Sequence, residues 1–395
     1  MLRCNSTEVN LHSIWKKLGK AAILAFFVLF FFTFCEFSTD NTSDDYEWQH
    51  DGSGGITIIN YTGPWGAIVI PSRFNGRPVR SIGGNAFAGS QLTNVIIPNS
   101  VTTIRDGAFR SNLLTSVTIP NSITHIGNWV FEINELKSIS IPDSVTYIGY
   151  GAFANNFLST LIIPNSVISI DHWAFAYNPL TSVTIGSSVT FIDENVFAWN
   201  SSLQEFIVDE NNIHFLSVDG VLFNTDKTKI ILFPQGREGS YIIPDSVTRI
   251  EGSAFSMGHL TSVTIPDSVI FIGDEAFSSN ELASVIIPDS VTFIGDASFA
   301  WNKIADVYIS NNITFIDDRA FMRNALTSVT IPDSVMFIGR WAFRDNHLIS
   351  IVIGANVGLG NLAFGSGFED FYQNNNRAAG TYTRPDANSI AWTRN

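Results

Sequence analysis

Cysteine is nearly absent from this chain. The 395 residues include only two, Cys4 and Cys35, and both precede residue 36. A disulfide framework, or a zinc site built from several thiolates, needs more cysteines than this at defined spacings. Residues 36–395 therefore cannot be held together by either device.

Charged residues are also scarce, at 15% of the chain, and acidic residues outnumber basic ones to give a net charge of -14. Residues 1–35 contain four basic residues and one acidic residue, so the remaining residues carry a net charge of -17. A surface of this sign repels phosphate backbones. We therefore expect no nucleic-acid partner.

The usual motifs of catalysis and metal binding are missing. No phosphate-binding loop, nucleophile elbow or metal-spaced histidine pair occurs in the sequence. Asp245, Asp267 and Asp289 recur every 22 residues, which leaves two interpretations, turn capping after a proline or calcium binding. Turn capping is favoured, so the sequence predicts no enzyme, no cofactor and no metal site.

Only one long apolar run is present, from Ala21 to Phe34, and it follows Lys16, Lys17 and Lys20. A basic stretch, then an apolar run, then a polar segment is the order of a secretory signal. As a helix rising about 1.5 Å per residue, this run would span roughly 21 Å, less than the ~30 Å apolar layer of a membrane. A permanent transmembrane helix is therefore the weaker interpretation.

Cys35 directly follows this run and is a candidate for lipidation, although Phe34 stands where lipoprotein signals have a small residue. The alternatives are cleavage just after Cys35 and retention as an uncleaved anchor. Each alternative places the rest of the chain outside the cytoplasm, at the cell surface or outer membrane or secreted. The only membrane contact expected is through this N-terminal anchor, with residues 36–55 as a polar tether.

Phenylalanine, in contrast, is abundant, with 32 residues, and most of it recurs with a fixed period. The step is 22 residues, interrupted by one step of 58 and closed by one of 21. An isoleucine keeps the same period five residues earlier. Such regularity is the mark of a repeat architecture. The recurring Phe positions are Phe87, Phe109, Phe131, Phe153, Phe175, Phe197, Phe255, Phe277, Phe299, Phe321, Phe343 and Phe364.

One copy of the repeat, Leu260 to Phe277, explains why the copies must stack. Val263 and Ile265 alternate with polar residues in the period of a strand, and Pro266 ends that strand because proline cannot donate to a ladder. The apolar residues of the second half must turn back inward. One copy cannot bury these faces alone, whereas copies stacked with parallel strands about 4.8 Å apart can.

Two columns of residues are predicted to be structural. The recurring Phe fills the core of each coil. An Asn three residues later can satisfy loop N–H and C=O groups that no ladder reaches. This column comprises Asn112, Asn134, Asn156, Asn178, Asn200, Asn280, Asn302, Asn324 and Asn346.

The segment Ser-Val-Thr-x-Ile-Gly-x-x-Ala-Phe, with Leu-Thr-Ser-Val-Thr-Ile-Pro between copies, resembles the BspA-type leucine-rich repeats of bacterial surface proteins. The resemblance covers residues 56–353, although many members have Cys where this chain has the Asn column. It implies a mainly β leucine-rich-repeat solenoid with a parallel β-sheet. It also implies surface display and adhesion to host molecules.

The long step between Phe197 and Phe255 predicts a β-hairpin insertion that protrudes from the stack while remaining part of it. Aromatic residues near both ends are expected to cap the core. The predicted organisation is an export signal or anchor at 1–35, a tether at 36–55, an N-terminal cap at 56–82, repeats at 83–203, the insertion at 204–243, repeats at 244–353 and a C-terminal cap at 354–395.

The residue before the repeating Ile is the best candidate for binding. In an extended chain it points away from the core, and in four successive copies it is Phe271, Phe293, Phe315 and Phe337. These four residues are called the Phe stripe below. A large exposed apolar patch marks an interaction site, unless neighbouring loops cover it. Further candidates lie two residues after the core Phe, namely Tyr177, Trp199 and Trp301, and two before it, namely Trp129, Trp173 and Trp341.

We therefore expect a monomeric surface protein that binds an extracellular protein or glycan through an extended face of the solenoid. The alternative is a display scaffold, or an immune-facing surface protein, without a dedicated ligand. An enzyme is disfavoured because the outward strand positions carry hydroxyl groups with no convergent acid or base.

Overall fold

The computed structural model describes residues 43–365 and 367–395. The chain divides into two units, Met1–Asp40 and Asn41–Asn395, and the description below concerns the second. The predicted export signal, including the lipidation candidate Cys35, lies outside the described residues. Within the described residues, no helix combines the length and the apolar character that crossing a membrane requires.

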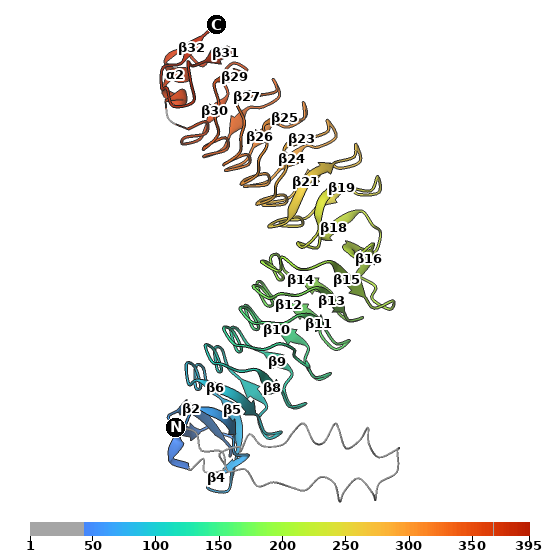
Figure 1. Ribbon diagram of the computed structural model, residues 1–395, viewed down its shortest axis with the longest axis vertical. Coiled ribbons are helices and arrows are strands. Elements are labelled where there is room, and N and C mark those ends of the chain that lie inside the picture. Colours follow the sequence, from blue (N-terminus) through green and yellow to red (C-terminus); the bar gives the residue numbers. More distant parts are fainter. Residues whose placement is uncertain (1–42, 366) are drawn as a thin grey trace, which may run out of the picture. The chain divides into compact units, whose positions relative to one another are not determined.

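The second unit is a stack of coils in which most coils add a strand to a first column of parallel strands, and the coil between β8 and β11 adds none (Figure 1). Val183 of β13 lies beside Leu161 of one neighbouring coil and Phe206 of the other. Their side chains point inward, as the alternation of apolar and polar residues predicts. The strands of this column are β3 (Gly66–Val69), β6 (Leu92–Ile96), β8 (Ser116–Thr118), β11 (Thr160–Ile162), β13 (Ser182–Ile185), β15 (Glu205–Val208), β19 (Glu238–Ile242), β21 (His259–Thr264), β23 (Ser284–Ile286), β25 (Asp306–Tyr308), β27 (Ser328–Thr330) and β29 (Ser350–Ile353).

A second column of parallel strands contains the repeating Ile, with two residues from each coil. Ile126, Ile148 and Ile170 are paired in register and buried, while the residue before each faces outward. The strands of this column are β7 (Thr103–Ile104), β9 (His125–Ile126), β10 (Tyr147–Ile148), β12 (Ser169–Ile170), β14 (Phe191–Ile192), β20 (Arg249–Ile250), β22 (Phe271–Ile272), β24 (Phe293–Ile294), β26 (Phe315–Ile316), β28 (Phe337–Ile338) and β30 (Gly358–Leu359).

The third side of each coil is a run of turns joined to the next coil by backbone hydrogen bonds. Phe131 N–H donates to Ala152 O at 2.8 Å, and the same bond recurs along the stack. Two residues flanking the core Phe adopt left-handed backbone angles, with φ of 54° at Trp129 and 56° at Ile133. Each such non-glycine residue costs about 1–2 kcal/mol, which the ladder and the buried ring must offset.

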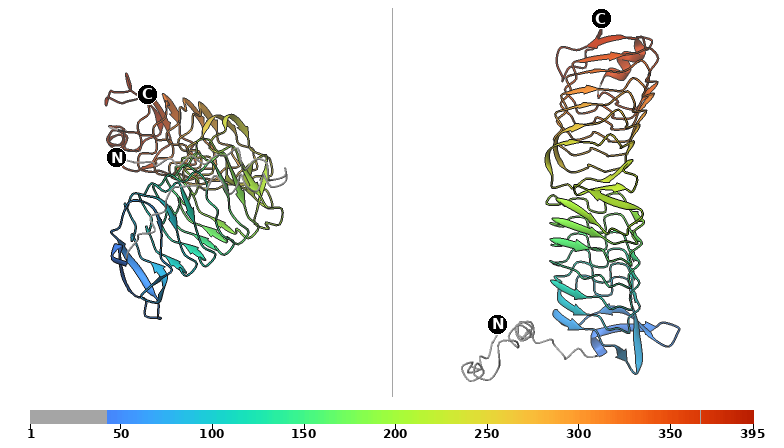
Figure 2. Two further views of the ribbon diagram at one scale, coloured as in Figure 1. Left: turned by 60° about the horizontal axis from the view of Figure 1, so that its bottom comes forward. Right: turned by 90° about the vertical axis from the view of Figure 1, so that its right-hand side faces the viewer.

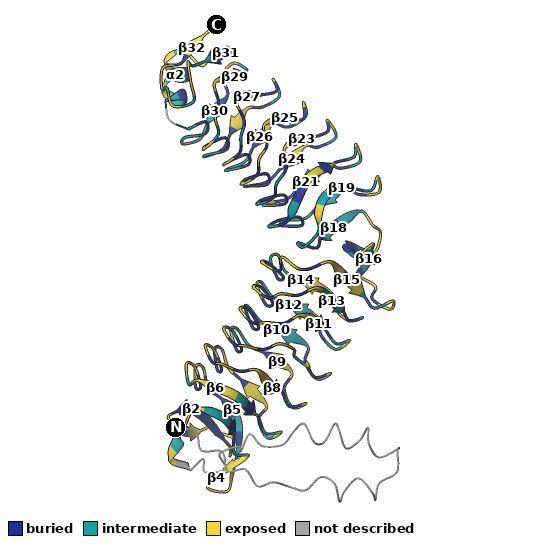
Figure 3. Ribbon diagram, in the orientation of Figure 1, coloured by how far each residue is buried: buried dark blue, intermediate teal, exposed yellow. Residues whose placement is uncertain are grey.

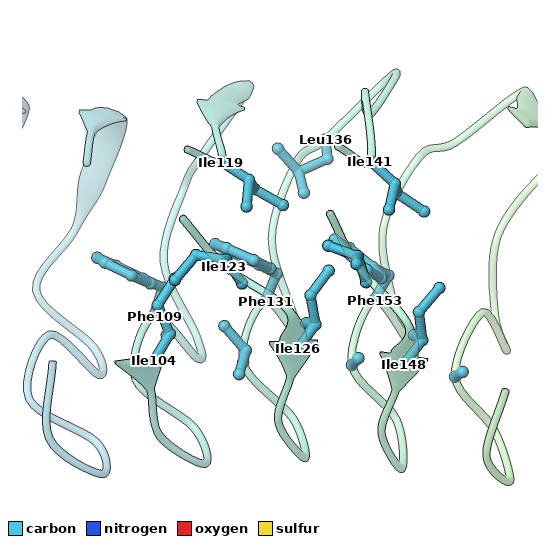
Figure 4. Packing of buried hydrophobic residues seen from close by; sticks show 14 of the residues in the cluster. Ile104, Phe109, Ile119, Ile123, Ile126, Phe131, Leu136, Ile141, Ile148 and Phe153 are labelled. Carbon is cyan, nitrogen blue, oxygen red and sulfur yellow. The ribbon is translucent and has the colours of Figure 1, made fainter. Parts of the chain in front are cut away.

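The recurring Phe rings are buried, as predicted, and form two stacks, one from Phe87 to Phe197 and one from Phe255 to Phe364, on either side of the insertion. Phe109 and Phe131 stack with centroids 5.6 Å apart and planes 4° from parallel, and Phe131 and Phe153 follow at 5.4 Å. Figure 4 shows these rings lying between the inward Ile side chains of both columns. None of the recurring Phe side chains is more than 4% exposed. Burying one such ring is worth roughly 2–3 kcal/mol.

The Asn column is largely buried and each Asn links two neighbouring coils, which confirms its structural role. Asn134 accepts a hydrogen bond from Leu114 N–H at 3.1 Å through Oδ1. Its Nδ2 donates to Phe109 O at 3.0 Å and to Phe131 O at 3.1 Å. One carboxamide thus satisfies backbone groups at the turn where no strand pairing is available.

At the N-terminal end, residues 46–50 form a strand that pairs antiparallel with its neighbour. The prediction of a polar tether over residues 36–55 is wrong for this segment, since Tyr46 is only 4% exposed and packs against Tyr61 and Phe74 with ring centroids 5.1 Å apart. The elements of this end are η2 (Ser43–Asp45), β1 (Tyr46–His50), β2 (Ile56–Tyr61), β4 (Arg73–Phe74) and β5 (Arg77–Ile82).

The insertion contains the expected hairpin, formed by antiparallel β17 (Val221–Asn224) and β18 (Lys229–Leu232), and β16 (Phe215–Val218) adds a second antiparallel pairing. The prediction that it protrudes is wrong. Leu222 packs into the apolar cluster of the preceding coils and Phe223 into that of the following coils. The hairpin thus joins the two runs of coils, in the region between β15 and β19 in Figure 1.

At the C-terminal end, α2 (Phe368–Asn374), β31 (Gly380–Thr383) and β32 (Thr393–Arg394) close the last coil. Strand β31 pairs antiparallel with β29, which ends the run of parallel pairing. Phe368, Tyr372 and Tyr382 are fully buried, and Tyr372 Oη donates to Gly354 O at 2.6 Å. Figure 2 shows these elements lying across the end of the stack.

Candidate binding surface

The four rings of the Phe stripe point away from the core, as the alternation along the strand predicts. Each is the first residue of a two-residue strand, and Phe271 pairs in register with Phe293 as Phe315 does with Phe337. Phe293, Phe315 and Phe337 are 37%, 41% and 37% exposed, while Phe271 is half-buried. Figure 3 shows that each coil along the stack contains both buried and exposed residues.

The rings of the stripe shield one another in pairs. The centroids of Phe271 and Phe293 are 4.8 Å apart with planes 5° from parallel, and those of Phe315 and Phe337 are 5.3 Å apart at 6°. Stacking at this distance is favourable and holds the rings edge-outward. The stripe is therefore an ordered aromatic surface whose ring edges remain accessible.

Each end of the stripe has a distinct boundary. At one end the guanidinium of Arg249 lies 3.8 Å from the ring centroid of Phe271, and its Nε is 3.4 Å from a carboxylate oxygen of Glu251. At the other end, Phe337 lies over Gly358, where a Cβ would come within 2.6 Å of the ring. The absence of a side chain at Gly358 leaves the space that this last ring occupies.

Apolar side chains widen the stripe on one flank. Ile270 and Met336, each preceding a stripe residue, are 48% and 69% exposed. Thr292 and Thr314 occupy the equivalent positions in the two coils between them and are also exposed. The apolar flank is therefore interrupted by two threonines, and exposed apolar side chains beside an aromatic stripe are typical of interaction sites in soluble proteins.

The second group of candidates is divided between two regions. Tyr177 and Trp199 lie in adjacent coils and stack, with centroids 5.6 Å apart and planes 12° from parallel. Trp301 lies beyond the insertion, in the other run of coils. All three rings are exposed, and all three residues have left-handed φ angles, between 53° and 61°.

A third aromatic group includes two residues that the sequence analysis missed. Tyr150 contacts Trp129 at 5.3 Å and Trp173 at 5.8 Å between centroids, and His172 lies 5.8 Å from Tyr150. Tyr150 and His172 are 22 residues apart, so they share one repeat position. That shared position is the signal that would have identified them.

Of the three aspartates that recur after a proline, Asp289 accepts hydrogen bonds from the turn of the next coil. Asp289 accepts a hydrogen bond from Asn311 N–H at 2.9 Å, and this bond, with those from the Asn311 side chain and Tyr308, holds the pKa of the Asp289 carboxyl below its usual range. Residues 43–365 and 367–395 contain no group of three or more His, Cys, Asp or Glu side chains suited to a metal.

Comparison with solved structures supports the architecture. A leucine-rich cell surface protein from Faecalibacterium prausnitzii is 25% identical, with 84% of this chain and 96% of that chain covered and a TM-score of 0.58. The pneumococcal vaccine antigen PcpA is 23% identical over 81% and 84% of the two chains, with a TM-score of 0.61. A leucine-rich repeat protein from Eubacterium ventriosum is 20% identical over 82% and 93%, with a TM-score of 0.58.

A search of curated proteins finds no significant match to this chain. The family model described as "BspA type Leucine rich repeat region (6 copies)" matches residues 68–179, 124–239 and 232–350. These matches span both runs of coils and the insertion between them. The 22-residue period, the two strand columns and the stacked Phe core agree with that assignment, and the chain belongs to the BspA-type leucine-rich repeat family.

Proposed function

We propose that this chain is an exported, surface-displayed binding protein that adheres to a macromolecule of a host or of a neighbouring cell. The observation that carries the proposal is the Phe stripe, in which four aromatic rings face outward without any role in the core. Aromatic side chains dominate the energetics of interfaces, and a solenoid offers an extended surface on which to arrange them.

The ligand in this proposal is an extracellular protein or glycan, and the binding unit is a monomer. Catalysis is not part of the proposal, because the outward strand positions offer hydroxyl groups rather than a convergent acid and base. Family membership and the likeness to a cell-surface repeat protein support export and display.

The test is binding of the full chain, solubilised in mild detergent, to a panel of extracellular-matrix proteins, mucins and glycans over a range of salt. Replacing all four residues of the Phe stripe by Ser should weaken any saturable interaction at least tenfold. A matched variant replaces four exposed isoleucines of the first column, Ile162, Ile207, Ile242 and Ile286, by Ser and should leave binding within about twofold.

Equal binding by the two variants would refute the role of the stripe. If the folded protein binds no member of the panel, the adhesion proposal fails and the display scaffold becomes the better account.

Anchoring is a separate part of the proposal and depends on Cys35. We propose that Cys35 is lipidated, with cleavage just after it or retention of the apolar run as alternatives. Incorporation of labelled fatty acid that is lost in Cys35→Ala would support lipidation. Unchanged incorporation in that variant would contradict it.

A further inference from the structure

The N-terminal end of the stack contains a polar cavity of about 400 Å³. It lies between the turn that follows β1 and the outward face of β2, β5 and β7. Thr57, Ser81 and Thr103 line it, and they are paired in one outward row across these strands. This row continues into the second column, where the Phe stripe lies at the opposite end of the stack.

Two arginines line this cavity, and the first is held in place by the turn above it. Arg80 Nη1 donates to both the carbonyl oxygen and the hydroxyl of Ser53, each at 3.0 Å. The stem of Arg80 passes so close to Gly55 that a Cβ there would lie 2.7 Å from Arg80 Cδ. The second, Arg105, is exposed, and its side chain has no hydrogen bond or ion pair with any described residue.

Arginine and lysine residues elsewhere on the coils are commonly matched by a carboxylate nearby. Examples are Lys303 with Glu281 at 2.9 Å and Arg340 with Asp318 at 3.2 Å. At the cavity the only carboxylate in the lining is Asp51. Its Oδ1 accepts from Ser53 N–H at 2.7 Å and from Gly55 N–H at 2.9 Å, so these backbone groups already use it.

The same bonds, with a smaller contribution from Arg80, hold the pKa of Asp51 below its usual range. The two guanidinium groups of Arg80 and Arg105 outnumber the single carboxylate of Asp51, so the cavity has a net positive charge on an otherwise acidic protein. Such a site attracts anions.

The floor of the cavity contains a polar atom without a partner. Ser81 is only 7% exposed, and its Oγ makes no hydrogen bond within the described residues. Thr57 beside it is 4% exposed. A buried hydroxyl without a partner is costly. Four other serines of the described residues are in the same state, and Ser81 differs from them in that it lines the cavity. The Ser81 Oγ is itself covered, so a ligand hydroxyl or oxyanion would satisfy it only after a small shift of the side chains around it.

We propose that this cavity binds an acidic sugar, with a carboxylate or sulfate group against Arg80 and Arg105 and sugar hydroxyls against Ser81 and Thr57. The planar guanidinium group matches an oxyanion in geometry and charge. The volume falls within the range of small-ligand sites, and a lining of hydroxyl and guanidinium groups suits a saccharide better than an apolar ligand. This site is independent of the Phe stripe.

The test is calorimetric titration of the full chain, in mild detergent, with sialyllactose, sulfated lactose, neutral lactose and inorganic sulfate. Binding of either acidic sugar, weakened by added salt, with no binding of neutral lactose is the expected result. Preference for sialyllactose identifies a carboxylate as the recognised group, and preference for sulfated lactose identifies a sulfate. Inorganic sulfate should compete with the preferred sugar.

Arg105→Gln should weaken the preferred sugar at least tenfold, and Ser81→Ala at least threefold. Arg77→Gln is the matched control, because it removes the same charge from an exposed arginine of β5 outside the cavity lining. It should change affinity by less than about twofold. Thermal unfolding of each variant checks the fold, and replacement of the Phe stripe by Ser should leave sugar binding unchanged.

Three results would overturn the proposal. Neutral lactose could bind as tightly as the acidic sugars, Arg105→Gln could bind like the unaltered chain, or no acidic sugar could bind at millimolar concentration.

Discussion

The residue before the repeating Ile takes different forms in the two runs of coils. Before the insertion this outward position is Thr103, His125, Tyr147, Ser169 and a single Phe, Phe191, and after it the position is Arg249 followed by the four residues of the Phe stripe. The inward neighbours are Ile in both runs, and the core Phe stack is alike in both. The fold therefore requires Ile at the inward position but does not restrict the residue at the outward position. The outward residues can thus be suited to a ligand without a loss of stability.

The largest expected effect separates a core ring from a stripe ring. Phe131→Ala should destabilise the protein by about 3–5 kcal/mol, because it removes a fully buried ring and leaves a cavity. Phe315→Ala should cost about 1 kcal/mol, since that ring is exposed and loses mainly its stacking partner. Urea unfolding followed by circular dichroism measures both. Similar losses in the two variants would contradict the division into inward and outward positions.

A smaller effect is expected from the Asn column, which both runs of coils share. Asn134→Ala should cost about 2–3 kcal/mol, because Leu114 N–H and the carbonyls that Asn134 bonds lose their partner inside the protein. Asn60→Ala, at an exposed position of β2, is the control and should cost less than about 0.5 kcal/mol. Thermal unfolding compares the two. An equal shift in both variants would show that the buried carboxamide has no special role.

The smallest effect concerns Tyr147, whose hydroxyl donates to Asp171 Oδ2 at 2.6 Å. Burial, then this bond, raises the pKa of Tyr147 to about 12. The folded state thus keeps a proton that the unfolded state, with a tyrosine pKa of about 10, releases. Tyr147 therefore contributes stability below about pH 10 that is lost as the pH rises towards about 12.

Tyr147→Phe places a Phe at this outward position, as in the stripe. Without the Tyr147 hydroxyl, the loss of stability between about pH 10 and about pH 12 should disappear. The measurement is the difference in tyrosine absorbance between the two proteins during titration with base. The unaltered chain should show one extra tyrosine ionising late. An identical late phase in Tyr147→Phe would mean that Tyr147 is not the residue responsible.

The sequence predicted the parts of the fold that repeat. The period of Phe131 and Ile126 predicted the stacked core, and alternation in an extended chain predicted that Phe293 and Phe315 face outward. That the Ile position forms a second column of strands was not predicted. Where the chain is not periodic, the prediction was incomplete. Tyr46 joins the first coil, and Leu222 and Phe223 of the insertion pack into the coils before and after it. These contacts depend on tertiary packing that no local pattern encodes.

The cavity at the N-terminal end shows the same limit at a candidate site. Arg80 and Arg105 do not share a repeat position, since they are 25 residues apart. They line one cavity because the turn containing Ser53 folds over β5. A pattern search along the repeat could find the stripe, but it could not find this pair.

The central claim is that the outward position of the second column carries binding and not folding. The most direct test replaces the stripe with the residues of the first run, as Phe271→Thr, Phe293→His, Phe315→Tyr and Phe337→Ser in one chain. We expect this chain to unfold within a few degrees of the unaltered protein and to lose at least tenfold in affinity for the partner that the panel identifies. Retained affinity, or a fold that fails together with binding, would contradict the claim.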